Sequence, residues 1–351
     1  MNKLLELFKN KNNENIIKPY FIAEAGVNHE GSIEIAKKLI HLAKEGGADA
    51  IKFQTYKANL IASKNSPSYW DLSKESTKSQ FQLFKKYDKF WKKEFEVLKN
   101  ECDKVGIEFM STPFDLESAN FLNDLQNVFK ISSSDLTNKP FIEHICKFKK
   151  PIILSTGASN EDEIKNSVNW INKYNNPLAL LHCVLSYPTS NLNANLGQIL
   201  GLKTMFSDKI IGYSDHTLPG NYEVLNLAVA LGSKIIEKHF THDKTLKGND
   251  HYHAFDKEDL LNYNKMVDNS LLIIGDRSVV SLDCEKKAIL NARRSLVASR
   301  NIKKNKCIVK EDLTWKRPGH GVSPKDIEKI IGRKANVDIN SDDIIHWNFF
   351  D

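Results

Sequence analysis

The sequence predicts an α/β protein in which a (β/α)8 TIM barrel is followed by a small β-rich domain. Three observations support this fold class. From residue 20 onward, short β-branched runs alternate with helical patterns of apolar residues. The alternation yields eight strand–helix units in roughly 270 residues, which favours a closed barrel over an open sheet. The internal strands are nearly continuous apolar runs, as expected for parallel strands that are buried on both faces.

The eight strands are expected in regular succession along the chain, at 21–25, 50–54, 108–111, 128–132, 151–155, 179–183, 209–213 and 234–239. Between them, apolar residues recur at i, i+3, i+4 and i+7, which predicts helices such as 33–44 and 161–174. The stretch 56–90 is too long for an ordinary loop, so it predicts an active-site excursion or an oligomer contact.

The last part of the chain has a different pattern, with short strand-like runs in SLVASR and LTWKRP and several turn residues. This β-rich module has about 55 residues, so its small core gives only marginal stability. The module is therefore expected to pack against a partner surface. The expected organisation is an N-terminal extension over 1–18, the barrel over 19–280, a linker over 281–294 and the C-terminal domain over 295–351.

Composition excludes several classes of protein. With 41% hydrophobic and 27% charged residues, the 351-residue chain is not collagenous, coiled-coil or disordered. Its 50 basic and 44 acidic residues are spread along the sequence, whereas a nucleic-acid-binding protein concentrates basic residues. No apolar run approaches the ~18–20 residues of a membrane span, and the N-terminus does not resemble a signal peptide. The five cysteines are scattered without CxxC spacing, which predicts a reduced, cytoplasmic protein without structural zinc or disulfides.

Polar side chains stand at almost every expected strand end, where (β/α)8 enzymes place their chemistry. One subset offers cations and hydroxyls without a glycine-rich phosphate loop, and it could surround a small phosphate: Lys52, Thr112, Lys130, Ser133, Ser155 and Ser214. The alternative is that each lysine is a solvated surface group or is buried against a carboxylate.

Two histidines, His216 and His239, end neighbouring strands. Neutral imidazoles at these positions could bind a divalent ion and leave open positions for water or substrate. A hydrogen-bonded structural role is the alternative for each. A Schiff-base aldolase is a rival interpretation, with Lys52, Lys130 or Lys238 as the nucleophile. That mechanism gives no reason for the paired histidines and the surrounding hydroxyls.

Eight ordered motifs closely resemble the sialic acid synthase family: FIAEAGVNHEGS (21–32), IKFQT (51–55), STPF (111–114), KISSSD (130–135), ILSTG (153–157), LLHCVLSYPT (180–189), GYSDHT (212–217) and IEKHF (236–240). The segments SLVASRNIKKN and LTWKRPGHGVSP are similar to the antifreeze-like (β-clip) domain of that family. The resemblance covers nearly the whole chain from residue 21.

The resemblance implies a reaction in which phosphoenolpyruvate condenses with an N-acylated mannosamine-type sugar, releasing phosphate, for surface-glycan biosynthesis. It implies that Lys52, Thr112, Lys130, Ser133, Ser155 and Ser214 bind phosphoenolpyruvate and that His216 and His239 hold Mn²⁺ or Mg²⁺. It also implies sugar contacts by Gln54, Phe114, Leu185, Tyr187, Asp250 and Arg317, with Glu24 and Asp135 acting on water or protons beside the histidines. The family's matching arginine reaches across a dimer, so Arg317 implies a domain-swapped homodimer.

Two departures from the family pattern concern the acceptor sugar. Leu185 stands where N-acetylneuraminate synthases usually have a sugar-facing asparagine, and Asp135 stands where the family commonly has glutamate. A diacetamido 6-deoxyhexose, as in legionaminic or pseudaminic acid synthesis, therefore competes with N-acetylmannosamine. The remaining alternatives are a synthase of a different 3-deoxy-ulosonate and a non-catalytic sugar- or phosphate-binding protein. Intact Lys52, Lys130 and both histidines argue against the non-catalytic alternative.

Overall fold

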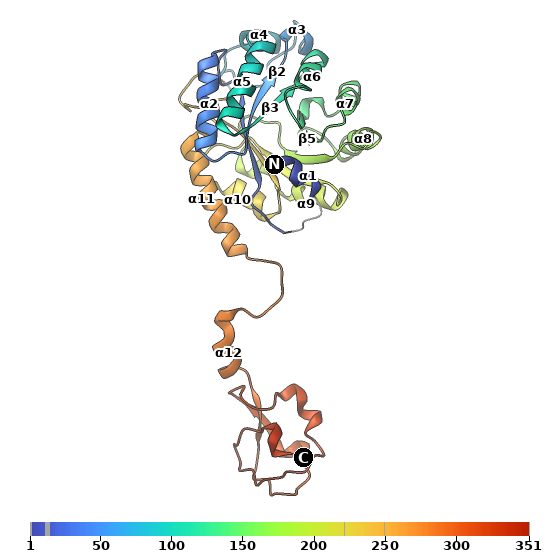
Figure 1. Ribbon diagram of the computed structural model, residues 1–351, viewed down its shortest axis with the longest axis vertical. Helices are drawn as coiled ribbons and strands as arrows, with labels where there is room; N and C mark the ends of the chain where they lie inside the picture. The colour runs from blue at the N-terminus through green and yellow to red at the C-terminus, as the bar shows by residue number, and fades with distance from the viewer. Residues whose placement is uncertain (1, 11–14, 221, 249, 351) are drawn as a thin grey trace. The chain divides into compact units, whose positions relative to one another are not determined.

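A computed structural model describes residues 2–10, 15–220, 222–248 and 250–350. The chain divides into two compact units, Met1–Asp276 and Arg277–Asp351. The first unit holds eight parallel strands in the order β3-β2-β1-β8-β7-β6-β5-β4, and β3 adjoins β4 where the ring closes (Figure 1). This confirms the predicted (β/α)8 barrel.

The strands lie within one or two residues of their expected bounds: β1 Tyr20–Gly26, β2 Ala50–Thr55, β3 Glu108–Pro113, β4 Phe129–Ile131, β5 Ile152–Ser155, β6 Leu178–Cys183, β7 Ile210–Asp215 and β8 Ile235–His239. Strand β4 is shorter than predicted because the Ser132 side chain accepts a hydrogen bond from the backbone N–H of Ser134. That bond begins a 3₁₀ turn, Ser133–Asp135, so β4 ends one residue before its predicted end; its other lost residue is Val128, at the start of the strand.

The helices of the first unit are α1 Lys3–Lys9, α2 Ile33–Glu45, α3 Ala58–Ile61, α4 Gln80–Tyr87, α5 Lys92–Val105, α6 Leu116–Leu122, α7 Lys139–Cys146, α8 Glu161–Asn172, α9 Gly197–Met205, α10 Glu223–Ala230 and α11 Lys257–Ile274. Helix α2 shows why they form, since its buried residues recur at helical spacing and the Ser32 side chain caps its first turn. No helix among the described residues is long and apolar enough to cross a membrane.

The N-terminal extension contains a helix that the sequence analysis did not anticipate. Leu4 and Phe8 of α1 are buried in a cluster with residues at the starts of the strands, including Tyr20, Ala50 and Ile210. Asn2 donates a hydrogen bond to Glu108 at 2.6 Å, and Tyr20 donates to the same carboxylate at 2.7 Å. Helix α1 therefore packs on the amino-terminal end of the barrel, which we call the barrel floor.

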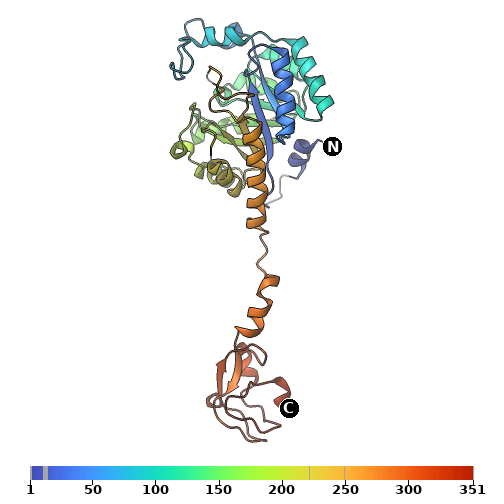
Figure 2. The ribbon, with the colours of Figure 1, turned by 90° about the vertical axis from the view of Figure 1, so that its left-hand side faces the viewer.

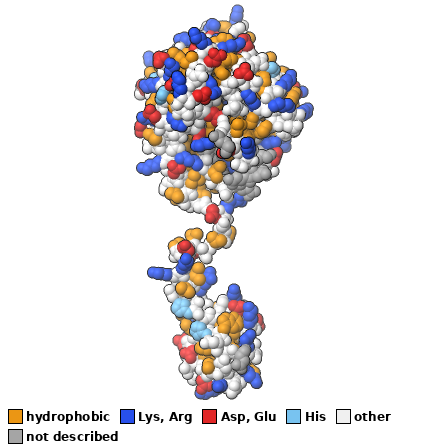
Figure 3. All heavy atoms as spheres, in the orientation of Figure 1, with side chains coloured by type: hydrophobic (Ala, Val, Ile, Leu, Met, Phe, Trp, Pro, Cys, Tyr) orange, Lys and Arg blue, Asp and Glu red, His pale blue; other side chains and the backbone are white. Residues whose placement is uncertain are grey.

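The second unit has its own small core around an antiparallel pair of strands, β9 Ser295–Ala298 and β10 Leu313–Lys316. Both strands lie within the runs that the sequence marked. Helix α12, Lys286–Asn291, lies in the segment expected to be a linker, and Leu290 accepts a hydrogen bond from the backbone N–H of Gly319. On the face drawn in Figure 3, lysine and arginine side chains are scattered over each unit and do not gather into one stripe.

Candidate active site at the carboxyl ends of the barrel strands

Strand register brings the predicted site residues together at the carboxyl ends of the strands, which we call the barrel mouth. Glu24 on β1 is level with Lys52 on β2 and with His239 on β8. Ser214 on β7 is level with Glu237 on β8. All five side chains are buried, so their polar groups must find partners inside the barrel.

Two lysines in the barrel mouth share buried carboxylates. The Lys52 ammonium pairs with Glu24, donates to Thr112 Oγ1 at 2.8 Å and lies 3.7 Å from Glu237 Oε2. The Lys130 ammonium lies 3.5 Å from Glu237 Oε1. Both lysines are thus buried against carboxylates, which the sequence analysis had weighed as an alternative to a phosphate role. The two explanations are compatible, because an incoming anion can share the same ammonium groups.

Three serines complete the hydroxyl set, and all three are buried. Ser214 Oγ donates to Glu237 Oε1 at 2.9 Å, and Ser133 Oγ accepts from the backbone N–H of Gly157 at 2.9 Å. Among the described residues, Ser155 Oγ has no hydrogen-bond partner. A buried hydroxyl in that state is available to a ligand.

The pKa values of the two carboxylates in the barrel mouth, Glu24 and Glu237, are shifted in opposite directions. Burial raises the pKa of Glu24 to about 7, with the nearby Glu237 adding to the rise and Lys52 only partly opposing it. Burial also acts to raise the pKa of Glu237, but Lys130 and Lys52 outweigh it and lower this pKa to about 2. Burial lowers the pKa of Lys130. Glu237 is therefore the permanent anion of the cluster, while Glu24 can exchange a proton near neutral pH.

A second group of polar residues combines imidazoles with a carboxylate. One ligand atom from each of His239, Asp250 and His253 lies within 4.8 Å of the others. His216 lies outside this group, although its ring centroid is 5.4 Å from that of His239. His216 Nδ1 lies 2.8 Å from the carbonyl oxygen of Val184, which fixes the ring. Imidazole and carboxylate groups are common ligands of divalent metal ions, so the donor set fits the expected cation.

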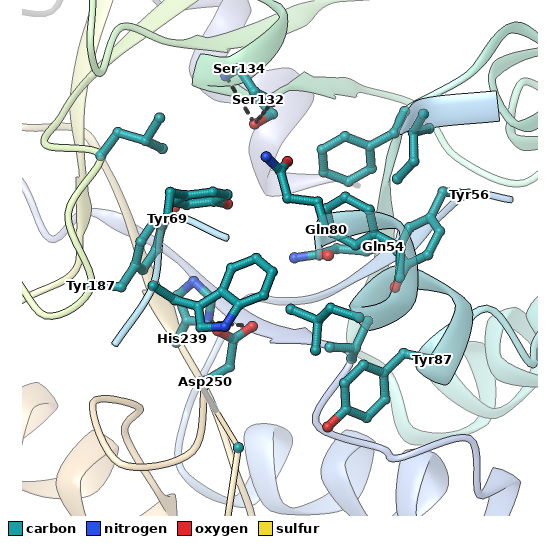
Figure 4. A pocket seen from close by; sticks show the side chains of 18 of the residues that line it. Gln54, Tyr56, Tyr69, Gln80, Tyr87, Ser132, Ser134, Tyr187, His239 and Asp250 are labelled. Atoms are coloured by element: carbon teal, nitrogen blue, oxygen red, sulfur yellow. Dashed lines mark hydrogen bonds and ion pairs between the residues drawn. The ribbon is translucent and has the colours of Figure 1, made fainter. Parts of the chain in front are cut away.

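A pocket of about 440 Å³ opens beside these groups (Figure 4). Its lining includes seven residues for which a site role was expected: Gln54, Phe114, Asp135, Leu185, Tyr187, His239 and Asp250. Figure 4 shows His239 and Asp250 next to each other at one end of the pocket, with Tyr187 beside them. The six phosphate-type residues do not line it, so they form a separate, deeper part of the site.

The long segment 56–90 supplies much of the pocket wall, and Figure 2 shows it lying across one end of the barrel. Its contribution is mostly apolar or aromatic: Tyr56, Leu60, Ile61, Tyr69, Trp70, Gln80, Leu83, Phe84 and Tyr87. Trp70 is held in place because its indole N–H donates to the carbonyl oxygens of Glu75 and Thr77, both at 3.1 Å. Of the two roles expected for this segment, the structure places it at the pocket.

Asp135 and Arg317 have different surroundings. Asp135 is half-buried, accepts a hydrogen bond from the Asn138 amide at 3.1 Å and has its pKa raised by burial. Arg317 is exposed and belongs to the second unit, directly after β10. Its role in a sugar site stays a prediction.

Lys238, a candidate nucleophile of the Schiff-base alternative, does not line the pocket. Its fully buried ammonium pairs with Asp215 at 2.6 Å and lies 5.3 Å from the centroid of the Phe255 ring. An ammonium fixed in this way is poorly placed to attack a substrate in the pocket.

Two residues of the site had no role assigned from the sequence. Glu237 lies near the end of an expected strand, but nothing in the sequence shows that it lies between two lysines. His253 was not noticed, although the run Asp250–His251–Tyr252–His253 places three potential metal ligands in four residues. That density of ligand-type side chains is the signal that could have found it.

The barrel, its buried lysines and the adjoining pocket define a TIM-barrel protein with a polar candidate site at the carboxyl ends of its strands. Residues 39–278 match the NeuB family and residues 293–351 match the SAF domain. The chain belongs to the NeuB family, which confirms the resemblance to sialic acid synthases with an antifreeze-like domain.

The chain is similar over most of its length to two other sequences and to one crystal structure. It is 41% identical over 334 residues to an uncharacterized protein of Methanocaldococcus jannaschii, covering 94% of both chains. It is 38% identical over 334 residues to the N,N'-diacetyllegionaminic acid synthase of Campylobacter jejuni, covering 93% of this chain and 99% of the relative. The crystal structure of the N-acetylneuraminic acid (sialic acid) synthetase from Leptospira borgpetersenii has a TM-score of 0.69 and 34% identity, covering 78% of this chain and 91% of that one.

Proposed function

We propose that the protein is a nonulosonic acid synthase that condenses phosphoenolpyruvate with an N-acylated amino sugar for surface-glycan biosynthesis. Carbon 3 of phosphoenolpyruvate forms a bond to the aldehyde carbon of the open-chain sugar. The aldehyde C=O double bond opens, and its oxygen takes up a proton to become a hydroxyl group. Water adds at carbon 2 and gives up one proton, and the C–O bond to phosphate then breaks while the new hydroxyl loses its remaining proton and becomes the ketone oxygen. The products are a 3-deoxy-2-keto sugar acid and inorganic phosphate.

The buried lysine–hydroxyl cluster is the observation that carries this proposal. Phosphoenolpyruvate is a small polyanion, and Lys52, Lys130 and Thr112 offer charge-assisted and neutral hydrogen bonds. Ser133, Ser155 and Ser214 add hydroxyls from the ends of β4, β5 and β7. Fixing the anion in the deep part of the site would present carbon 3 toward the pocket where the sugar binds, and this raises the rate by orientation.

The pocket fits an acceptor that is polar at one end and apolar along its side. Gln54, Tyr187 and Asp250 supply hydrogen-bonding groups, while Leu185 and Phe114 supply apolar surface. The name of the Campylobacter jejuni relative supports a diacetamido 6-deoxy sugar as the acceptor. N-acetylmannosamine is the second candidate.

Glu24 is proposed to take the proton that water releases, since its pKa of about 7 lets it act as a base at neutral pH. Asp135, at the pocket wall, is the second candidate for orienting water. A divalent cation, Mn²⁺ or Mg²⁺, bound at His239 with His216 or its other polar neighbours, would supply Lewis acidity toward the aldehyde oxygen.

The test is product analysis with a panel of acceptors. The protein is incubated with phosphoenolpyruvate, Mn²⁺ and either N-acetylmannosamine or a 2,4-diacetamido-2,4,6-trideoxyhexose, and the products are weighed by mass spectrometry while phosphate release is followed. We expect one nonulosonic acid per phosphate released and no release without an aldehyde sugar. Borohydride trapping of a protein–substrate imine would favour the Schiff-base alternative, and phosphate release that survives exhaustive chelation would remove the metal from the reaction.

We also propose that the protein is a domain-swapped homodimer in the cytoplasm, with Arg317 serving the partner's pocket. The small core of the second unit and its exposed arginine support this arrangement, and its five free cysteines suit a reducing compartment. Mixing inactive His239→Ala with inactive Arg317→Ala protein tests it. A mixed dimer holds one barrel with its own His239 and an intact partner arginine, so activity should return after subunit exchange. A mixture that stays inactive after exchange is confirmed by mass would contradict the swap.

A further inference from the structure

We propose that a basic cleft on the outer side of segment 56–90 binds a small molecule that carries phosphate groups, at a site separate from the barrel mouth. The cleft has a volume of about 560 Å³ and lies between that segment and the loop that joins β8 to α11. Its lining holds one carboxylate, Glu75, against four lysines: Lys74, Lys86, Lys244 and Lys247. None of these residues belongs to the set expected to bind phosphoenolpyruvate or the sugar.

Two of the four lysines are held in place by carboxylates. Lys86 pairs with Glu75 at 3.1 Å. Lys244 pairs with Asp256 at 2.9 Å and with Asp259 at 2.6 Å. The two aspartates do not line the cleft. Because a side chain that is already ordered loses less conformational freedom when a ligand binds, these pairs prepare the cleft for an anion.

The other two lysines have charge to offer. Lys74 and Lys247 are exposed, and neither forms an ion pair within the part of the chain that the structure describes. The Lys74 ammonium lies 5.3 Å from the centroid of the Tyr252 ring, which also lines the cleft. Asp71 offsets part of this charge, since hydrogen bonds from Ser73 and the nearby Lys74 lower the pKa of its carboxyl group.

The chemistry of the lining favours phosphate over a carboxylate ligand. A phosphate group carries about two negative charges at neutral pH and three strong acceptor oxygens, so it can meet Lys74 and Lys247 together. Lysine is a common phosphate ligand as a compact, mobile point charge. The Ser76 hydroxyl also lines the cleft and makes no hydrogen bond with other described residues, so it can donate to a phosphate oxygen.

The basic cleft shares its walls with the pocket of Figure 4. Gly248 lines both cavities, and on α4 Lys86 lines the cleft while the next residue, Tyr87, lines the pocket. The Tyr252 hydroxyl donates to the carbonyl oxygen of Tyr187, a pocket residue, at 3.2 Å. A ligand in the cleft would therefore hold segment 56–90 against the β8–α11 loop and steady two walls of the pocket.

The experiment measures binding of pyrophosphate, a probe with two phosphate groups. The full-length protein is saturated with phosphoenolpyruvate, which occupies the lysines of the barrel mouth, and is titrated with pyrophosphate by calorimetry without added divalent ions. We expect one pyrophosphate per chain, with an affinity that falls as salt rises because exposed charges are screened. Hydrogen exchange should slow in residues 73–76 and 244–248, which locates the site.

A double variant and a control with the same change in charge test the assignment. Lys74→Gln with Lys247→Gln should weaken pyrophosphate binding about tenfold, because two exposed charge contacts are lost. Lys64→Gln with Lys78→Gln removes two exposed lysines of segment 56–90 that do not line the cleft, and should change the affinity less than about twofold. Asp71→Asn should strengthen binding, because it removes the opposing charge.

Three results would overturn the proposal. They are wild-type affinity in the Lys74→Gln, Lys247→Gln protein, an equal loss of affinity in the control protein, and exchange protection that is confined to the barrel strands. Circular dichroism checks that each variant is folded, which is expected because all four lysines are exposed. None of these measurements requires turnover, so their outcome is independent of the proposed function.

Discussion

Replacing Glu237 with glutamine should lower the unfolding free energy of the barrel and raise its affinity for phosphoenolpyruvate. Glutamine keeps the shape of the side chain and an oxygen that can accept from Ser214, but it removes the buried negative charge. Glu237 lies 3.5 Å from Lys130 and 3.7 Å from Lys52. At such distances a charge pair is worth about 4 kcal/mol at an effective dielectric constant of about 20. Removing one partner of a buried pair typically costs about 3–5 kcal/mol of unfolding free energy.

The same charge opposes substrate binding, because an anionic ligand must share the lysines with Glu237. If a third of one pair's energy is recovered, about 1.4 kcal/mol, affinity for phosphoenolpyruvate rises about tenfold. Calorimetry measures the affinity for phosphoenolpyruvate, and thermal unfolding measures stability. The unfolding transition of the barrel is identified as the one whose midpoint rises when phosphoenolpyruvate is added. Glu101→Gln, at a surface carboxylate paired with His41, is the control and should change neither quantity. A Glu237→Gln protein that is as stable as wild type, or that binds phosphoenolpyruvate more weakly, would refute this account of the charge balance.

Three further predictions concern other parts of the chain. Leu4→Ala at the barrel floor should lower the unfolding free energy of the first unit by about 2–5 kcal/mol, measured by denaturant unfolding, because Leu4 is fully buried. Asp312 is held by Lys306, Arg300 and the Val309 N–H, which outweigh burial and lower its pKa to about 2. The ionised Asp312 therefore stabilises the second unit above about pH 4, and this contribution is lost as the pH falls through 2. Asp312→Asn should lower the melting temperature of the second unit at pH 7. Calorimetry should also show that this melting temperature depends less on pH than in the wild type. Leu185→Asn should shift the ratio of kcat/KM values toward N-acetylmannosamine, and an unchanged ratio would make Leu185 a packing residue only.

The barrel could be predicted closely because each strand is a compact apolar run between clear helical patterns. Turn chemistry accounts for the difference at Ser132, where a side-chain hydrogen bond ends β4 early. Helix α1 was missed because a seven-residue amphipathic segment is too short to stand out. Its burial against the barrel floor is a tertiary effect that local pattern does not show.

Some residues of the site could likewise be predicted from the sequence, and others could not. Residues at strand ends could be predicted to share the barrel mouth, because parallel strands align their carboxyl ends. The position of His253 could not, since it follows β8 by fourteen residues and the path of the intervening loop has no periodic signal. The partner of Lys52 and Lys130 was equally hidden, because register decides which strand-end residues face each other.

Strand β8 carries three consecutive ionisable residues with incompatible surroundings. Glu237 faces two ammonium groups, Lys238 pairs with Asp215 beside the Phe255 ring, and His239 faces Asp250. Because side chains alternate along a strand, sliding β8 by one residue in one direction would set the Lys238 ammonium between Lys52 and Lys130. Sliding it by one residue in the other direction would set the Glu237 carboxylate beside Asp215. Both like-charge placements would be buried. The charges on β8 thus also favour one strand register when the barrel closes, because they disfavour misaligned pairings that hydrophobic contacts alone would tolerate.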